Sequence, residues 1–121
     1  MILADTSLWV DLFRGRKIAT FAALLASRKV LMHSAVLGEL ATGNLRERSA
    51  TLAMLRSLPR ATTGTTTECL AAIESRKLYG RGIGWIDVQL LVAAQLSHAR
   101  LWSLDTQLME AARELRVAYL Q

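Results

Sequence analysis

The chain has 121 residues, with 15 Lys or Arg and 10 Asp or Glu, which gives a formal net charge of +5 and an isoelectric point near 10.1. This length predicts one domain, residues 1–121, that folds without a disulfide or a structural metal. The sequence has no apolar run long enough to span a membrane and no charged signal-peptide start. We therefore expect a cytoplasmic protein with no membrane segment, whose basic surface attracts nucleic acid or an acidic partner.

Short apolar runs alternate with helical patterns along the chain. Strand-like runs fall at 2–5, 29–33, 100–104 and 117–120, and residues 59–63 have the pattern of an edge strand. Helices are predicted at 8–13 after a Thr6 or Ser7 cap, and at 18–27, 34–40 after a Ser34 cap, 45–58, 68–79, 85–99 and 105–115. This alternation is typical of parallel sheets. It predicts an α/β fold, a three-layer α/β/α sandwich with a central parallel sheet.

Four carboxylates stand in positions unlike those of ordinary surface acids. Asp5 and Asp105 follow predicted strands, at the carboxyl edge where parallel sheets bind ligands. Glu39 lies in a helical segment with no basic residue within a turn on either side, and Asp87 interrupts a helix that is apolar nearly all round. Because the architecture brings all four positions near one end of the sheet, we expect them to gather there.

Three of these carboxylates also have an individual structural explanation. Asp5 and Asp105 can cap the helices that follow them, and Asp87 can interact with the positive end of its own helix. Clustered carboxylates repel one another in a low dielectric, so the group favours a bound cation. Oxygen ligands suit Mg²⁺ or Mn²⁺ rather than zinc. The other acids are expected on the solvated surface: Asp11, Glu47, Glu68, Glu74, Glu110 and Glu114.

A hard divalent cation within a basic surface indicates phosphodiester chemistry. One or two ions would activate a water and stabilise the leaving oxygen. Arg14, Arg16 and Arg81 flank loops that are expected at the site face. We expect these arginines to hold the phosphates of the substrate.

Four segments follow one another in the order seen in PIN-domain proteins: MILADTSLWVDLFRG, HSAVLGELATG, GIGWIDVQLLVAAQ and ARLWSLDTQLMEAA. Over essentially its whole length the chain resembles the VapC toxins of bacterial and archaeal toxin–antitoxin pairs. The opening DTS with Trp9 and the later SLD are the more specific parts. The family usually has Thr two residues before its last aspartate, where this chain has Ser103, which keeps the hydroxyl.

The resemblance implies a Mg²⁺- or Mn²⁺-dependent endoribonuclease, usually a homodimer, that cuts structured RNA such as tRNA or ribosomal RNA. It implies inhibition by a VapB-type antitoxin, which commonly covers the site and sometimes inserts an Arg among the acids. The acidic residues of the family correspond to Asp5, Glu39, Asp87 and Asp105. We expect Asp5, Asp87 and Asp105 to ligate metal, directly or through waters, and Glu39 to ligate metal or orient water. Thr6, Ser7 and Ser103 are expected to support them by hydrogen bonding.

The sequence is also compatible with functions other than that of a toxin. A housekeeping RNA-processing PIN nuclease and a non-catalytic PIN-like module that binds RNA or a partner stay open. A receiver-type signalling domain is disfavoured, because no Asp lies between Asp11 and Asp87 and no Lys follows Lys77. A metal-free ribonuclease would need His33 and His98 as acid and base.

The remaining distinctive residues have structural interpretations. Trp102 and Cys69 are predicted in the core. Trp9 and Trp85 are predicted in packing or dimer contacts, with base stacking as the alternative. The GRGIG segment at 80–84 is predicted as a flexible joint, because its glycines do not fit a phosphate-binding motif.

Overall fold

The computed structural model describes residues 1–120. Three short strands, β1 (Ile2–Ala4), β2 (Val30–Leu31) and β3 (Arg100–Trp102), form a parallel sheet in the order β2-β1-β3. Leu3 of β1 aligns with Leu31 on one side and with Leu101 on the other. Single parallel bridges, Met32 to Arg60 and Leu101 to Ala118, pair two further segments with this sheet. The predicted parallel α/β architecture is confirmed.

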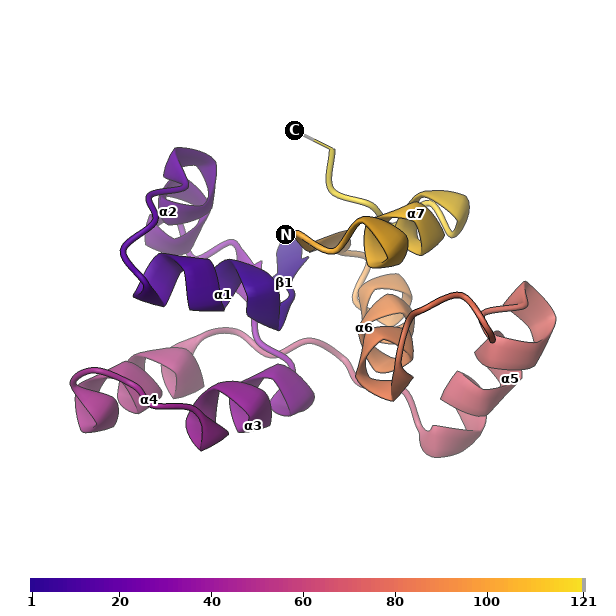
Figure 1. The fold of residues 1–121 in the computed structure, drawn as a ribbon, viewed down its shortest axis with the longest axis horizontal. Helices are drawn as coiled ribbons and strands as arrows, with labels where there is room; N and C mark the ends of the chain where they lie inside the picture. Colours follow the sequence, from indigo (N-terminus) through magenta and orange to yellow (C-terminus); the bar gives the residue numbers. More distant parts are fainter. Residues whose placement is uncertain (121) are drawn as a thin grey trace.

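Within the described residues, seven helices surround the sheet, which runs through the middle of the molecule (Figure 1). In this view the first four helices lie to the left of β1 and the last three to the right, so the sheet is covered on both faces. Strands that are buried on both faces are continuously apolar rather than alternating, as Ile2–Ala4 is. The helices are α1 (Thr6–Phe13), α2 (Ala19–Ala26), α3 (Ser34–Thr42), α4 (Arg48–Ser57), α5 (Thr66–Arg76), α6 (Trp85–Leu96) and α7 (Thr106–Glu114).

Helix α6 is the central helix of its layer. It packs on β1 and β3 and is covered on its outer side by α5. Six of its residues are therefore buried, Leu90 and Leu91 completely. This explains why its sequence is apolar nearly all round, and why the carboxylate of Asp87 is tolerated only in its first turn.

An aromatic cluster fills the core beside the sheet. Phe21 meets Trp9 edge-on at a ring-centroid distance of 5.0 Å and Trp102 at 5.9 Å. Both tryptophans are buried, as is Cys69, which confirms the predicted core positions of Trp102 and Cys69 and the packing role of Trp9. No helix of the described chain is both long enough and apolar enough to cross a membrane.

Several element boundaries differ from those predicted. The cap of α1 is Asp5 and not Thr6 or Ser7, and the cap of α3 is His33 and not Ser34. Helix α4 begins three residues late, after Glu47 in the left-handed region at φ 48°. Helix α6 ends three residues early, before His98 at φ 51°. The segments 59–63 and 117–120 join the sheet by one bridge each and not as full strands.

Candidate active site

The carboxyl edge of the sheet brings together the residues that follow β1 and β3. The backbone N–H of Asp5 donates to the carbonyl of Trp102 at 2.9 Å, so the two chains leave the sheet side by side. Asp5 then begins α1, and Ser103 leads to Asp105, which begins α7. The parallel register thus fixes Asp5 next to Ser103, although 98 positions separate them in the sequence.

The carboxylate of Asp5 is buried and held from three directions. Its Oδ1 accepts the backbone N–H of Thr6 at 2.7 Å. Its Oδ2 accepts the hydroxyl of Ser103 at 2.6 Å and that of Ser7 at 3.0 Å. A carboxylate has about four acceptor positions. Asp5 is only 9% exposed, so these bonds fix its orientation while leaving it room for one further contact.

Ser7 and Ser103 also hold the loop that leads to Asp105. The backbone N–H of Leu104 donates to Ser7 Oγ at 3.1 Å, and that of Asp105 donates to Ser103 Oγ at 2.9 Å. The two hydroxyl oxygens lie 3.4 Å apart. Each serine therefore links the loop after β3 to the carboxylate after β1.

Three further carboxylates are each held through only one oxygen. Glu39 Oε1 accepts the hydroxyl of Thr6 at 2.7 Å. Asp87 Oδ2 accepts the backbone N–H of Gly84 at 2.9 Å. Asp105 Oδ1 caps α7 by accepting two backbone N–H groups. Glu39 Oε2, Asp87 Oδ1 and Asp105 Oδ2 have no hydrogen-bond partner within the described chain. Glu39 and Asp105 are exposed, and Asp87 is half-buried. Each group thus offers a free oxygen to a ligand.

Two hollows receive these groups, and the hydrogen bond between Asp5 and Ser103 connects their linings. One, of about 550 Å³, is lined by Asp5, Glu39 and Asp87 together with Thr6, Ser7, Trp85 and two further α6-end residues. The other, of about 460 Å³, is lined by Ser103, Asp105 and residues of α7 and the C-terminal segment. Three of the four predicted carboxylates thus share one hollow, and the fourth lies in the adjoining one.

The pKa of Asp87 is affected by the charges of the other three carboxylates. Burial raises its pKa above the ordinary 3.8, the Gly84 N–H opposes that shift, and the negative charges of Asp5, Asp105 and Glu39 raise it further. A bound cation offsets the repulsion between such negatively charged groups. The charge of the cluster therefore fits a positively charged ligand.

The donor set suits a hard ion that keeps part of its own ligand shell. Within residues 1–120, no three His, Cys, Asp or Glu side chains lie close enough together to hold an ion by themselves. Mg²⁺ commonly binds through one or two carboxylates, with waters and substrate phosphates as its remaining ligands. An arrangement of separate carboxylate oxygens around an open hollow fits that mode, and not a closed all-protein cage.

The three arginines predicted to hold phosphates differ in their surroundings. Arg14 lines a hollow of about 300 Å³ together with Thr6 and Glu39, at the margin of the site. Arg16 instead pairs with Asp11 at 2.8 Å. Arg81 pairs with Glu114 of α7. Only Arg14 of the three is therefore next to a site carboxylate without an ion-pair partner in the described chain.

The two histidines do not form an acid–base pair. His33 follows β2 at the carboxyl edge, is 2% exposed and caps α3, with Nδ1 accepting the backbone N–H of Ala35 at 3.0 Å. Burial lowers its pKa, and the charge of Arg60 lowers it further. His98 precedes β3 and therefore lies at the opposite edge of the sheet. The metal-free reading based on these two residues is wrong.

Sequence reasoning missed two features of the site. Ser7 and Ser103 are expected to hydrogen-bond to the carboxylates, but their additional bonds to the loop after β3 join chain segments far apart, and no local pattern signals them. Trp85, predicted in a packing or dimer contact, is 44% exposed and lines the hollow that contains Asp5 and Asp87. Its position as the first residue of α6, directly after the Gly84 cap, is the only local signal of that exposure.

Carboxylates at the carboxyl edge of a parallel sheet, between two helical layers, define the class to which this chain belongs. Residues 2–115 match the PIN domain, and the chain is a member of the PIN-domain family. It is 37% identical over 119 residues to ribonuclease VapC32 of Mycobacterium tuberculosis, in strains CDC 1551 / Oshkosh and H37Rv, across 98% of this chain and 95% of the relative. The resemblance to VapC-type PIN proteins is thereby confirmed.

Proposed function

We propose that this protein is a VapC-type toxin, an endoribonuclease that requires Mg²⁺ or Mn²⁺. The main support is the carboxylate cluster at the sheet edge, in which Asp5 is fixed by Ser7 and Ser103 while Glu39, Asp87 and Asp105 each keep an accessible oxygen. Further support comes from the PIN-domain match and from the relative that is named a ribonuclease. The presence of all four carboxylates argues against a non-catalytic binding module.

Each residue of the cluster has a separate role in this proposal. Asp5, Asp87 and Asp105 hold the cation, directly or through waters. Glu39, turned by its bond from Thr6, ligates the cation or orients the attacking water. Thr6, Ser7 and Ser103 are positioning residues that keep the carboxylates in place. When bound, the cation lowers the pKa of water and neutralises charge on the phosphate.

A cleavage assay with and without divalent ion tests this function. Purified protein is incubated with a mixture of tRNA and ribosomal RNA in Mn²⁺, in Mg²⁺ and in EDTA. We expect discrete cuts with either ion, loss of cleavage in EDTA and recovery when the ion is restored. Cleavage that persists in EDTA would contradict metal dependence. Intact RNA under every condition would contradict the nuclease assignment.

We also propose that the protein is a homodimer whose partner is a VapB-type antitoxin, and that RNA is its substrate. The support is the VapC name of the relative and the basic charge of the chain. Sedimentation of the protein alone, and of the protein co-expressed with a small protein encoded next to its gene, measures both assemblies. A monomer in the first sample, or no complex in the second, would contradict them.

A further inference from the structure

Three arginines that the proposed chemistry does not use form a basic patch beside the outer edge of the sheet. Arg100 begins β3, Arg113 lies in the last turn of α7, and Arg116 follows that helix. All three are exposed. They line one hollow of about 330 Å³ together with Ala118 and Leu120. We call Arg100, Arg113 and Arg116 the edge patch.

No side-chain carboxylate among residues 1–120 neutralises the positive charge of the edge patch. In the part of the chain that the structure describes, none of its arginines forms an ion pair, and its hollow is lined by no carboxylate. The acids of α7, Glu110 and Glu114, are absent from that lining, and Glu114 pairs with Arg81. Arg100 donates to the carbonyl of Arg116 at 2.7 Å. That bond holds one guanidinium in place, and each guanidinium keeps several free donors.

The edge patch is continuous with the carboxylate cluster. Arg113 lines both the patch hollow and the 460 Å³ hollow that contains Ser103 and Asp105. The chain from Arg100 to Asp105 runs along β3 from the amino edge of the sheet to its carboxyl edge. Because β3 ends at Trp102 and the chain then bends, these positions are at most about 16 Å apart at about 3.3 Å per residue. A chain-like polyanion that reaches Asp105 can therefore extend along this edge.

We propose that the edge patch binds the phosphate backbone of the RNA on one side of the cleavage site, an inference that rests on the proposed ribonuclease function. The charge is positive and has no ion-pair partner among residues 1–120, guanidinium groups recognise phosphates well, and the patch shares Arg113 with the hollow of Asp105. The contacts lie away from the reacting atoms, so they strengthen RNA binding without taking part in the bond-breaking step.

The salt dependence of RNA binding tests this inference. A fluorescently labelled single-stranded RNA is titrated with the protein in EDTA, so that nothing is cut, at several KCl concentrations. Each lost phosphate contact lowers the slope of log K against log salt by about 0.7. We expect the triple variant Arg100→Gln, Arg113→Gln, Arg116→Gln to lose about two units of slope. That corresponds to about 100-fold weaker binding at 0.1 M salt if the titrations converge at 1 M.

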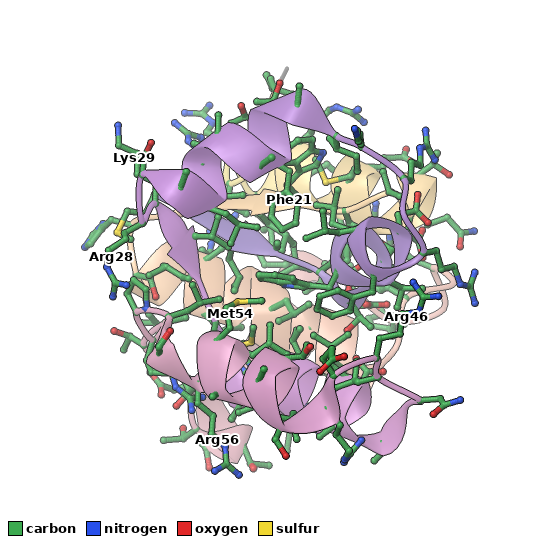
Figure 2. The ribbon with its side chains drawn as sticks, turned by 90° about the vertical axis from the view of Figure 1, so that its left-hand side faces the viewer. Phe21, Arg28, Lys29, Arg46, Met54 and Arg56 are labelled. Carbon is green, nitrogen blue, oxygen red and sulfur yellow. The ribbon has the colours of Figure 1, made fainter. Side chains whose placement is uncertain are left out.

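Two further variants separate position from total charge and from folding. The first is a control triple variant, Lys29→Gln, Arg56→Gln, Arg76→Gln, which removes the same charge from exposed residues elsewhere. Lys29 and Arg56 point outward on the α2 and α4 side of the molecule (Figure 2). This control should keep nearly the wild-type slope. The second is the triple variant Arg100→Lys, Arg113→Lys, Arg116→Lys, which keeps the charge of the edge patch. Its slope of log K against log salt should be close to that of the wild type. With metal present, the Gln triple variant should raise KM and leave kcat within about twofold.

The outcomes also distinguish this inference from the proposed function. Equal slopes for the edge-patch variant and its control overturn the inference, even if both proteins cut RNA. Retained RNA binding combined with lost binding to an acidic partner protein also overturns it, and identifies a protein surface. RNA binding that depends on the patch, in a protein that cuts no RNA with any metal, would support the patch and contradict the nuclease assignment.

Discussion

At the scale of single residues, the site combines structural and chemical roles in the same side chains. Asp5 and Asp105 are helix caps, as their individual structural explanations predicted, and they also belong to the carboxylate cluster. Capping uses only part of each group: Asp105 caps through Oδ1 and leaves Oδ2 free. The two explanations are therefore compatible, and the cap helps to aim the carboxylate.

Ser103 is the residue on which this aiming depends most. Its hydroxyl donates to Asp5 Oδ2 at 2.6 Å and accepts the backbone N–H of Asp105 at 2.9 Å in a buried position. Ser103→Ala should lower the free energy of unfolding by about 1–3 kcal/mol, because buried partners lose their hydrogen bonds. We also expect a tenfold or greater fall in RNA cleavage, since Asp5 loses its orientation.

Ser103→Thr is the matched variant, because it keeps the hydroxyl that VapC-type proteins usually carry as Thr. Its cleavage rate should remain within a few-fold of the wild type, measured under the same Mn²⁺ conditions. Equal losses in the Ala and Thr variants would show that the packing at Ser103, and not its hydroxyl, matters.

At the scale of elements, the sequence pattern predicts which segments are strands or helices better than it predicts where they end. Apolar runs and helical spacing identify β1, β3 and α6. Caps are less predictable, because Asp5, Thr6 and Ser7 are all good cap residues and only the tertiary bonds of Ser7 and Thr6 decide between them. The pair of Arg81 with Glu114 likewise joins segments 33 positions apart, which local charge spacing cannot reveal.

The His33 cap gives α3, the helix that carries Glu39, a pH-dependent start. Nδ1 accepts a backbone N–H, which only the neutral ring can do, and the pKa of His33 lies below its ordinary 6.5 because of burial and Arg60. Below pH 6.5 the unfolded chain therefore binds a proton that the folded chain does not. Stability falls as the pH drops below 6.5, by at most about 1.4 kcal/mol per pH unit.

Urea unfolding between pH 7.5 and 5.5 measures this dependence. His33→Asn keeps a good cap residue that does not titrate, so its stability should change less over this range than that of the wild type. His98→Asn alters the exposed histidine and should follow the wild-type curve. Identical pH dependence in the wild type and His33→Asn would contradict the account of α3.

At the scale of the whole molecule, the fold gathers its mutually repelling carboxylates at the carboxyl edge of the sheet. A parallel sheet covered by helices on both faces brings Asp5 and Asp105 out at the same edge, and α3 and α6 bring Glu39 and Asp87 to it. The sequence is sufficient to predict that these carboxylates gather at one edge, because connections in parallel sheets follow general rules. It does not predict that Asp105 lies in an adjoining hollow, because the side-chain geometry depends on the full packing.

The stability of the protein should therefore depend on divalent ions. Mn²⁺ at about 100 times its Kd should add about 2.7 kcal/mol to the free energy of unfolding. Asp87→Asn removes one repelling charge and keeps an acceptor for the Gly84 N–H. It should raise Tm in EDTA by up to a few degrees and reduce the stabilisation by Mn²⁺. Thermal unfolding of both proteins with and without Mn²⁺ checks this, and a lower Tm of Asp87→Asn in EDTA would contradict it.

The most direct test of the proposed active site compares Asp5, which caps α1, with Asp11, which lies within the same helix. Asp5→Asn removes the buried carboxylate of the cluster, whereas Asp11→Asn removes one that is paired with Arg16, and both change the charge equally. With RNA and saturating Mn²⁺, kcat/KM of folded Asp5→Asn should fall on the order of 10³-fold or more. Asp11→Asn should stay within about twofold of wild type. Wild-type cleavage by folded Asp5→Asn would contradict the account of the site.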